Sequence, residues 1–179
     1  MTAQTLSPPN APWTPLQRAF LILIAIACAA LVWNAYSPGD VPFADLKYEA
    51  LQGDSEPLVN IGWEQRPLQI QNKNYPIGLA VETDSLIELR YLPNGYRYFS
   101  AEIGVSADEA AGGPNAIVFT VLSEGAVLYQ SPVMRPGMPP HLVWVPVLDR
   151  QTLALKTMRA SDDAPGGRAV WGLARFIHH

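Results

Sequence analysis

The longest apolar run of the chain covers residues 19–33, which read AFLILIAIACAALVW without a charge or a strongly polar group. Such a run is shorter than the roughly 18–20 residues that cross a bilayer, but its flanks extend it. Thr14 is a good N-cap and Pro15 suits a first helical position. A helix over residues 15–36 would be about 33 Å long, close to the ~30 Å hydrocarbon core of a bilayer. The sequence therefore predicts one membrane-spanning helix.

Aromatic and small residues are placed as such a span requires. Trp13 lies at one end and Trp33 and Tyr36 lie at the other, where aromatic rings favour the two membrane interfaces. The small residues that would let another transmembrane helix approach closely are Ala25, Ala29 and Ala30. A cleaved signal peptide is the alternative. However, residues 1–17 lack the Lys and Arg that usually open a signal peptide, so a retained anchor is favoured.

Charges beside the span indicate its orientation. Arg18 stands at the N-terminal edge, whereas the first basic residue on the other side is Lys47. Because basic flanks tend to stay in the cytoplasm, we expect a bacterial inner-membrane protein with its N-terminus inside. The predicted parts are a cytoplasmic tail (1–14), the transmembrane helix (15–36), a linker (37–42) and a periplasmic domain (43–179).

Composition and motifs exclude several function classes. The chain has 12 Lys and Arg against 16 Asp and Glu, so it lacks the basic footprint that nucleic acid requires. Its single cysteine, Cys28, falls in the apolar run, so the predicted outer domain has no thiol chemistry. None of the three histidines belongs to a nucleophilic triad pattern, and zinc and phosphate-loop motifs are absent. We expect no catalytic activity.

The outer part has the pattern of a β protein. Short apolar or alternating stretches are separated by Gly, Pro, Asn and Asp, and no stretch keeps a helical period. Pro146 interrupts one stretch, which places it near a sheet edge. Within strands, Tyr98 and Trp171 are expected to be core or half-buried. The predicted strands cover residues 67–71, 77–81, 86–91, 98–105, 116–122, 127–129, 142–148, 152–158 and 169–177.

The order of these segments from Phe43 onward resembles the NPCBM/NEW2 domain. The most specific pieces are GYRYFSAEIGV (Gly95–Val105) and LYQSPVM (Leu128–Met134). The resemblance implies a mainly β fold, an antiparallel jelly-roll β-sandwich of the galactose-binding-like type, here behind one N-terminal transmembrane helix. It also implies carbohydrate binding.

Two segments depart from the pattern of that family. Members often carry a KGIGTHA-type segment, and Glu82 stands here where the histidine would fall. Members also often end on an acidic stretch leading to DWADA, whereas residues 168–174 read RAVWGLA. In the second segment the polar groups around the tryptophan have become apolar. The two departures therefore indicate that the scaffold is kept while the ligand positions of the family are eroded.

Two groups of residues are candidates for binding a glycan or a partner. Trp63 and Tyr96 lie near turns and are expected to be exposed enough to contact a glycan. The loop over residues 133–140 is apolar and proline-rich, which suits docking on a partner or a membrane; the alternative is a loop folded over the sandwich end. The docking residues would be Met134, Arg135, Pro136 and Met138.

A structural calcium ion is the one cofactor that the sequence suggests. Asp162 and Asp163, before Gly166 and Gly167, could offer oxygens to it. A solvated turn is the alternative, since Asp and Gly favour turns.

Two functions are weighed from these features. The first is a non-catalytic accessory subunit that stabilises an integral membrane protein complex, photosynthetic or respiratory, through its helix and its sandwich, in contact with membrane lipids. The alternative is a membrane-anchored carbohydrate-binding protein that recognises envelope glycans.

Overall fold

The computed structural model describes residues 22, 24, 39–92 and 94–178. Almost all of the predicted membrane helix, the tail before it, and the span residues Trp13, Arg18, Ala25, Ala29, Ala30, Trp33 and Tyr36 lie outside these residues. Within the described part of the chain, no helix has the length and apolar character needed to cross a bilayer.

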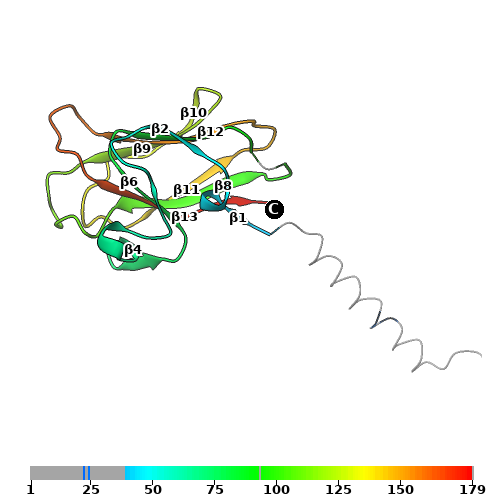
Figure 1. Ribbon diagram of the computed structural model, residues 1–179, viewed down its shortest axis with the longest axis horizontal. Helices are drawn as coiled ribbons and strands as arrows, with labels where there is room; N and C mark the ends of the chain where they lie inside the picture. Colours follow the sequence, from blue (N-terminus) through cyan, green and yellow to red (C-terminus); the bar gives the residue numbers. More distant parts are fainter. Residues whose placement is uncertain (1–21, 23, 25–38, 93, 179) are drawn as a thin grey trace, which may run out of the picture. The chain divides into compact units, whose positions relative to one another are not determined.

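Two antiparallel sheets make up the fold (Figure 1). Sheet A contains, in spatial order, β11 (His141–Pro146), β8 (Tyr98–Val105), β13 (Arg168–Ile177), β6 (Gly78–Glu82) and β3 (Leu58–Val59), while β1 (Val41–Pro42) also pairs with β13. Sheet B contains β10 (Ala126–Gln130), β9 (Ile117–Ser123), β12 (Leu153–Arg159), β7 (Ser85–Leu89) and β2 (Glu49–Gln52). The remaining elements are the hairpin of β4 (Leu68–Ile70) and β5 (Lys73–Tyr75) and the 3₁₀ turns η1 (Phe43–Asp45) and η2 (Trp63–Gln65).

The observed strands confirm the predicted antiparallel sandwich. All nine predicted stretches contain a strand, and β11, which ends at Pro146, is an edge strand of sheet A as expected. Four strands were not predicted, namely β1, β2, β3 and β5. Each has two to four residues, too few to show an alternating pattern. Since β1 pairs with β13, the sandwich begins within the stretch predicted to be a linker.

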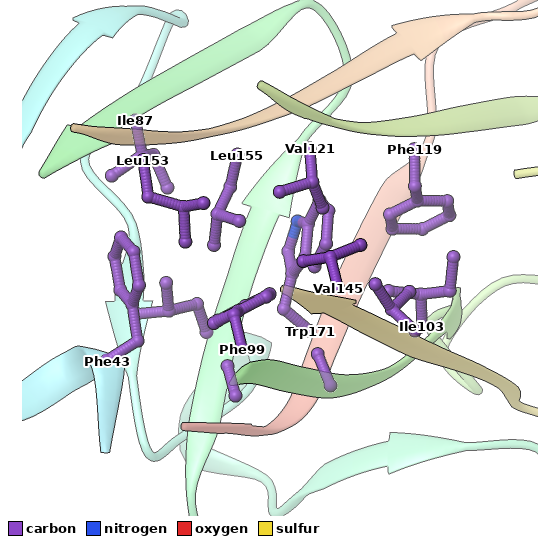
Figure 2. Packing of buried hydrophobic residues seen from close by; sticks show 14 of the residues in the cluster. Phe43, Ile87, Phe99, Ile103, Phe119, Val121, Val145, Leu153, Leu155 and Trp171 are labelled. Atoms are coloured by element: carbon purple, nitrogen blue, oxygen red, sulfur yellow. The ribbon is translucent and has the colours of Figure 1, made fainter. Parts of the chain in front are cut away.

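The main core lies between the facing sides of the two sheets (Figure 2). Strict alternation builds it: in β12, Leu153 and Leu155 point inward, and in β11, Val143 and Val145 do the same. Trp171 of sheet A is fully buried, and its ring meets Phe119 of sheet B edge to face at 5.2 Å. The expectation that Trp171 belongs to the core is therefore confirmed.

The β4–β5 hairpin covers part of the outer side of sheet A. It forms a second, smaller core of Leu68, Ile70, Tyr75, Ala80 and Val170. Glycines allow the close approach: a side-chain carbon added at Gly172 would lie 2.5 Å from the Tyr75 ring, and one at Gly104 would lie 2.5 Å from Ile70. The hairpin thus divides the outer face of sheet A into two exposed regions.

Candidate functional site

A polar depression with a volume of about 360 Å³ opens at the end of the sandwich where β6 turns into β7 and where β13 begins. We call it the end depression. Its walls combine carboxylates, guanidinium groups and a hydroxyl group, all of which can form hydrogen bonds with a ligand. The lining residues are Asp54, Glu82, Thr83, Asp84, Glu109, Arg159, Gly166, Gly167 and Arg168.

Backbone hydrogen bonds fix the two loops that frame this depression. The Thr83 amide donates to the Gly167 carbonyl at 2.9 Å, and the Gly167 amide donates to the Thr83 hydroxyl at 3.0 Å. Beside them, Asp84 forms an ion pair with Arg159 at 2.8 Å. The depression therefore rests on strand ends that are tied together, as a preorganised binding site requires.

Glu109 connects a third loop to the same place. One of its carboxylate oxygens accepts from the Arg168 amide at 3.1 Å, and the other accepts from the Asn115 side-chain amide at 2.7 Å. These bonds fix the Glu109 carboxylate and the start of β13 together. The side chain of Arg168 remains available for other contacts.

That side chain lies over an aromatic ring. The Arg168 guanidinium carbon is 5.0 Å from the centre of the Trp63 ring, within the range of a cation–π interaction. Trp63 is half-buried and packs on the small outer core. An aromatic ring and a guanidinium group thus stand together beside the carboxylates of the end depression.

The loop that carries Trp63 has an unusual backbone. Asn60, Glu64 and Gln65 all have positive φ angles, between 55° and 61°, which cost free energy in residues other than glycine. Asn60 is held by two bonds to Gly78, from its amide to the carbonyl and from the Gly78 amide to its side-chain oxygen, both at 2.9 Å. These bonds tie the loop that carries Trp63 to the start of β6.

The structure does not support the expected exposure of Tyr96, the second candidate for glycan contact. Its side chain is only 7% exposed, its ring packs edge to face on Phe176, and its hydroxyl donates to the Gly39 carbonyl at 3.0 Å. The expectation failed because a position near a turn does not fix the direction of the ring, which here points into the core.

The apolar loop over residues 133–140 was predicted either to dock on a partner or to fold over the sandwich end, and the structure agrees better with the second of these. Met134 is 2% exposed and exchanges two backbone hydrogen bonds with Ile117, and Pro136 is buried as well. These two docking assignments are therefore wrong, since both side chains lie inside a loop that folds over the sandwich end. Arg135 and Met138 are exposed, and their proposed role stays a prediction.

The candidate calcium ligands lie in the loop between β12 and β13. Asp162 and Asp163 are both exposed. Across the described ranges 39–92 and 94–178, His, Cys, Asp and Glu side chains do not gather in groups of three that could hold a metal ion. The calcium site stays a prediction.

A further polar cluster lies on the outer face of sheet A. Glu102 of β8 accepts hydrogen bonds from Lys73 at 2.6 Å and from Tyr75 at 2.7 Å. Burial alone would raise the pKa of Glu102, but the bonds from Lys73 and Tyr75 outweigh it, so the pKa is lowered. Burial and the bond to Glu102 raise the pKa of Tyr75.

Because the pKa of Glu102 is lowered in the folded state, its stabilising effect exists above the unfolded pKa of ~4.3 and disappears as pH falls further. We expect Glu102→Gln to lower the free energy of unfolding by roughly 1–2 kcal/mol at pH 7 and by a smaller amount at pH 3. Urea denaturation at both pH values measures this. Glu88→Gln is the control, since Glu88 meets Arg90 only at 3.8 Å; an equal effect of both variants would contradict the assignment.

The fold is an antiparallel β-sandwich with a depression at its loop end that is lined by charged groups, one of which, Arg168, contacts the Trp63 ring. Carbohydrate-binding modules have this architecture. Comparison with known proteins agrees: residues 39–177 match the model of the NPCBM/NEW2 domain family. The chain belongs to that family. It therefore contains a carbohydrate-binding module, which is a non-catalytic type of domain.

The chain is also similar to individual proteins. It is 30% identical over 111 residues to a Renibacterium salmoninarum protein named "Putative endo-alpha-N-acetylgalactosaminidase", covering 62% of this chain and 7% of that protein. The chain thus spans a small fraction of the length of this relative.

Solved structures show the same fold. The CBM51 of Clostridium perfringens GH95 in complex with methyl-galactose has a TM-score of 0.69 at 22% identity, covering 77% of this chain and 99% of that one. The CBM51-2 and INT domains of Clostridium perfringens ZmpB, in complex with GlcNAc, have a TM-score of 0.69 at 20% identity, covering 76% and 31%. At these identities the likeness shows the fold alone.

Sequence reasoning singled out only part of the end depression. Glu82 was noted as a departure from the family pattern, and Trp63, whose ring contacts the lining residue Arg168, was predicted as a glycan contact. Asp54, Asp84 and Arg159 were missed, because each stands beside a turn, where charged residues are common. The ion pair of Asp84 and Arg159 joins residues 75 positions apart, which no local pattern reveals.

Proposed function

We propose that the domain binds a sugar of a glycan at the end depression, with Trp63 and Arg168 as the principal contacts. The observation that carries this proposal is the stacking of Arg168 on Trp63 beside a depression lined by hydrogen-bonding side chains. A sugar ring offers an apolar face to an aromatic ring and hydroxyl groups to charged side chains. The family and the CBM51 fold support the same function.

Charge indicates the class of sugar. Four carboxylates (Asp54, Glu82, Asp84, Glu109) and two guanidinium groups (Arg159, Arg168) line the depression, which leaves a net charge of −2. An acidic sugar would be repelled by this excess. The site therefore suits a neutral hexose or an N-acetylhexosamine, such as the methyl-galactose and GlcNAc in the titles of the structural neighbours.

The comparisons support this function better than an accessory subunit of a membrane complex. The predicted anchor over residues 15–36 adds a location to the proposal: it would hold the domain on the periplasmic side of the bacterial inner membrane, within reach of envelope glycans. Protease treatment of spheroplasts tests this location. The domain should be degraded from outside, and a domain protected until the membrane is lysed would contradict the location.

Loss of the aromatic or cationic contact is expected to weaken sugar binding. Trp63→Ala and Arg168→Ala should each raise the Kd for methyl galactoside or N-acetylglucosamine at least about tenfold, equivalent to ~1.4 kcal/mol. Isothermal titration calorimetry on the full chain measures the change. The hydrogen bond from the Arg168 amide to Glu109 does not involve the Arg168 side chain, so the Arg168→Ala protein should stay folded.

Tyr91→Ala is the matched control, because Tyr91 is 88% exposed and follows the far end of β7. It should bind as the unchanged protein does. Sugar binding that survives both the Trp63 and the Arg168 substitutions would contradict the proposed site. Failure of a broad glycan array to detect any ligand would contradict the proposed function.

A further inference from the structure

The second exposed region of sheet A carries an aromatic pair that the end depression does not use. Trp144 of β11 is 49% exposed, although its strand neighbours Val143 and Val145 are buried in the core. The ring of Tyr98, on the adjacent strand β8, lies 5.2 Å from it at 37°. Both rings sit on paired strands of one sheet, where the backbone is rigid.

Charged and polar groups surround this pair. Trp144 of β11 is paired with Ser100 of β8, and Ser100 is paired in turn with Arg175 of β13. Arg175 forms an ion pair with Asp40 at 3.4 Å. Glu102 follows Ser100 by two residues on the same face of β8. Its carboxylate accepts hydrogen bonds from Lys73 and Tyr75, which lower its pKa. Donors and acceptors thus stand around an aromatic centre, and the arrangement repeats that of Trp63, Arg168 and the carboxylates of the end depression.

The two places lie on the same face of sheet A. Arg168 points to the outer side, as does Val170, which lies under the β4–β5 hairpin; Arg175 points outward between the buried residues Ala174 and Phe176. Both arginines belong to β13 and are seven residues apart. A bulge between Gly172 and Arg175 removes one position from the alternation, so both point outward at a separation of roughly 20 Å, or six positions at ~3.3 Å each. The β4–β5 hairpin lies over β13 between the two arginines. Only a glycan long enough to pass around the hairpin could therefore reach both places, which an oligosaccharide can do and a single sugar cannot.

We propose that Trp144, Tyr98 and the adjoining Glu102 and Arg175 form a second sugar-binding site, which takes a further residue of the glycan chain held at the end depression. Besides the exposed Leu142, charges of both signs stand at neighbouring register positions of the same sheet face. They favour a neutral polyhydroxyl ligand over the apolar face of a protein partner, whose interface core is depleted of charge. Linking two weak sites through one ligand raises the overall affinity without any new contact at either site. The inference extends the proposed function but depends on different residues.

Paired ligands of different length test this inference. The full chain is titrated with methyl galactoside and N-acetylglucosamine and with a linear pentamer of each sugar. Trp144→Ala should weaken binding of the recognised pentamer at least about fivefold and leave the Kd of the single sugar unchanged. Trp144→Phe should retain most of the pentamer affinity, because it keeps an aromatic face. Val127→Ala, at an exposed position of sheet B, is the control and should have no effect.

The outcomes separate this proposal from the proposed function. Pentamer binding that depends on Trp144 while Trp63→Ala has no effect would support the second site and reject the end depression. Pentamer binding unaffected by Trp144→Ala, or no binding of either pentamer, would overturn the second site. If Trp144→Ala left pentamer binding intact but changed the oligomeric state in sedimentation, the aromatic pair would be a contact between copies of the chain. If it instead abolished cosedimentation with phosphatidylglycerol vesicles, the pair would be a lipid contact. Either result would overturn the second site.

Discussion

Replacing Trp171 by alanine is expected to lower the free energy of unfolding by about 3–5 kcal/mol, the usual cost of truncating a large buried aromatic side chain. Trp171 is fully buried between the sheets and meets Phe119 at 5.2 Å. The cavity left by the indole would lie in the core shown in Figure 2, among side chains of both sheets that can fill only part of it.

Urea denaturation followed by circular dichroism measures this change. Trp144→Ala removes the same side chain from an exposed position and should cost less than about 1 kcal/mol. Trp171→Phe should be much milder than Trp171→Ala, because the indole nitrogen has no hydrogen-bond partner among the described residues and its loss breaks no bond. Equal costs for Trp171→Ala and Trp144→Ala would contradict the assignment of the core.

A second large effect is expected at Gly78, the first residue of β6. Its φ angle is +151°, and a side-chain carbon there would overlap the backbone carbonyl oxygen of Trp171 on the paired strand β13. Backbone atoms within a sheet cannot move aside as a flexible side chain can. Gly78→Ala should therefore cost at least about 2 kcal/mol, combining backbone strain with steric overlap.

Gly39→Ala is the matched control for this substitution. An added carbon at Gly39 would meet no atom within 4 Å, and alanine restricts the unfolded chain, so the free energy of unfolding should stay the same or rise slightly. Thermal or urea denaturation of both variants decides the point. A Gly78→Ala protein as stable as Gly39→Ala would show that β6 and β13 are not paired as described.

The sequence predicted the sandwich because long strands carry their own evidence. In β12, buried residues alternate with partly buried ones from Leu153 to Thr157, and that period can be read from the residue types alone. The eight residues of β8 are nearly all buried, and their length and apolar content mark the strand. Strands of two or three residues such as β1 and β3 exist only because a longer neighbour pairs with them. Their positions follow from tertiary contacts, which local patterns do not contain.

The end depression was harder to foresee for the same reason. Glu82, Glu109 and Arg168 are far apart in the sequence, and each is an ordinary charged residue in its own segment. Only Trp63 carried a signal of its own, an aromatic side chain beside a turn. The same signal misled at Tyr96, whose ring is buried, because sequence does not show to which side a turn residue points.

The departures from the family pattern gain a different meaning from the structure. Glu82 and Arg168 are paired in register across β6 and β13, and both line the end depression. A charged group thus stands at Glu82, where the family histidine would fall, whereas the positions around Trp171 are apolar and include Val170 and Leu173. The first departure therefore leaves a hydrogen-bonding group at the end depression, and the second does not.

Amide chemical-shift mapping tests the central proposal most directly. The full chain, labelled with ¹⁵N in detergent micelles, is titrated with methyl galactoside and with N-acetylglucosamine. Binding at the end depression predicts saturable shifts centred on the amides of Thr83, Gly167 and Arg168 and on the indole N–H of Trp63. Saturable shifts confined to another part of the sandwich, with these four signals unmoved, would contradict the account.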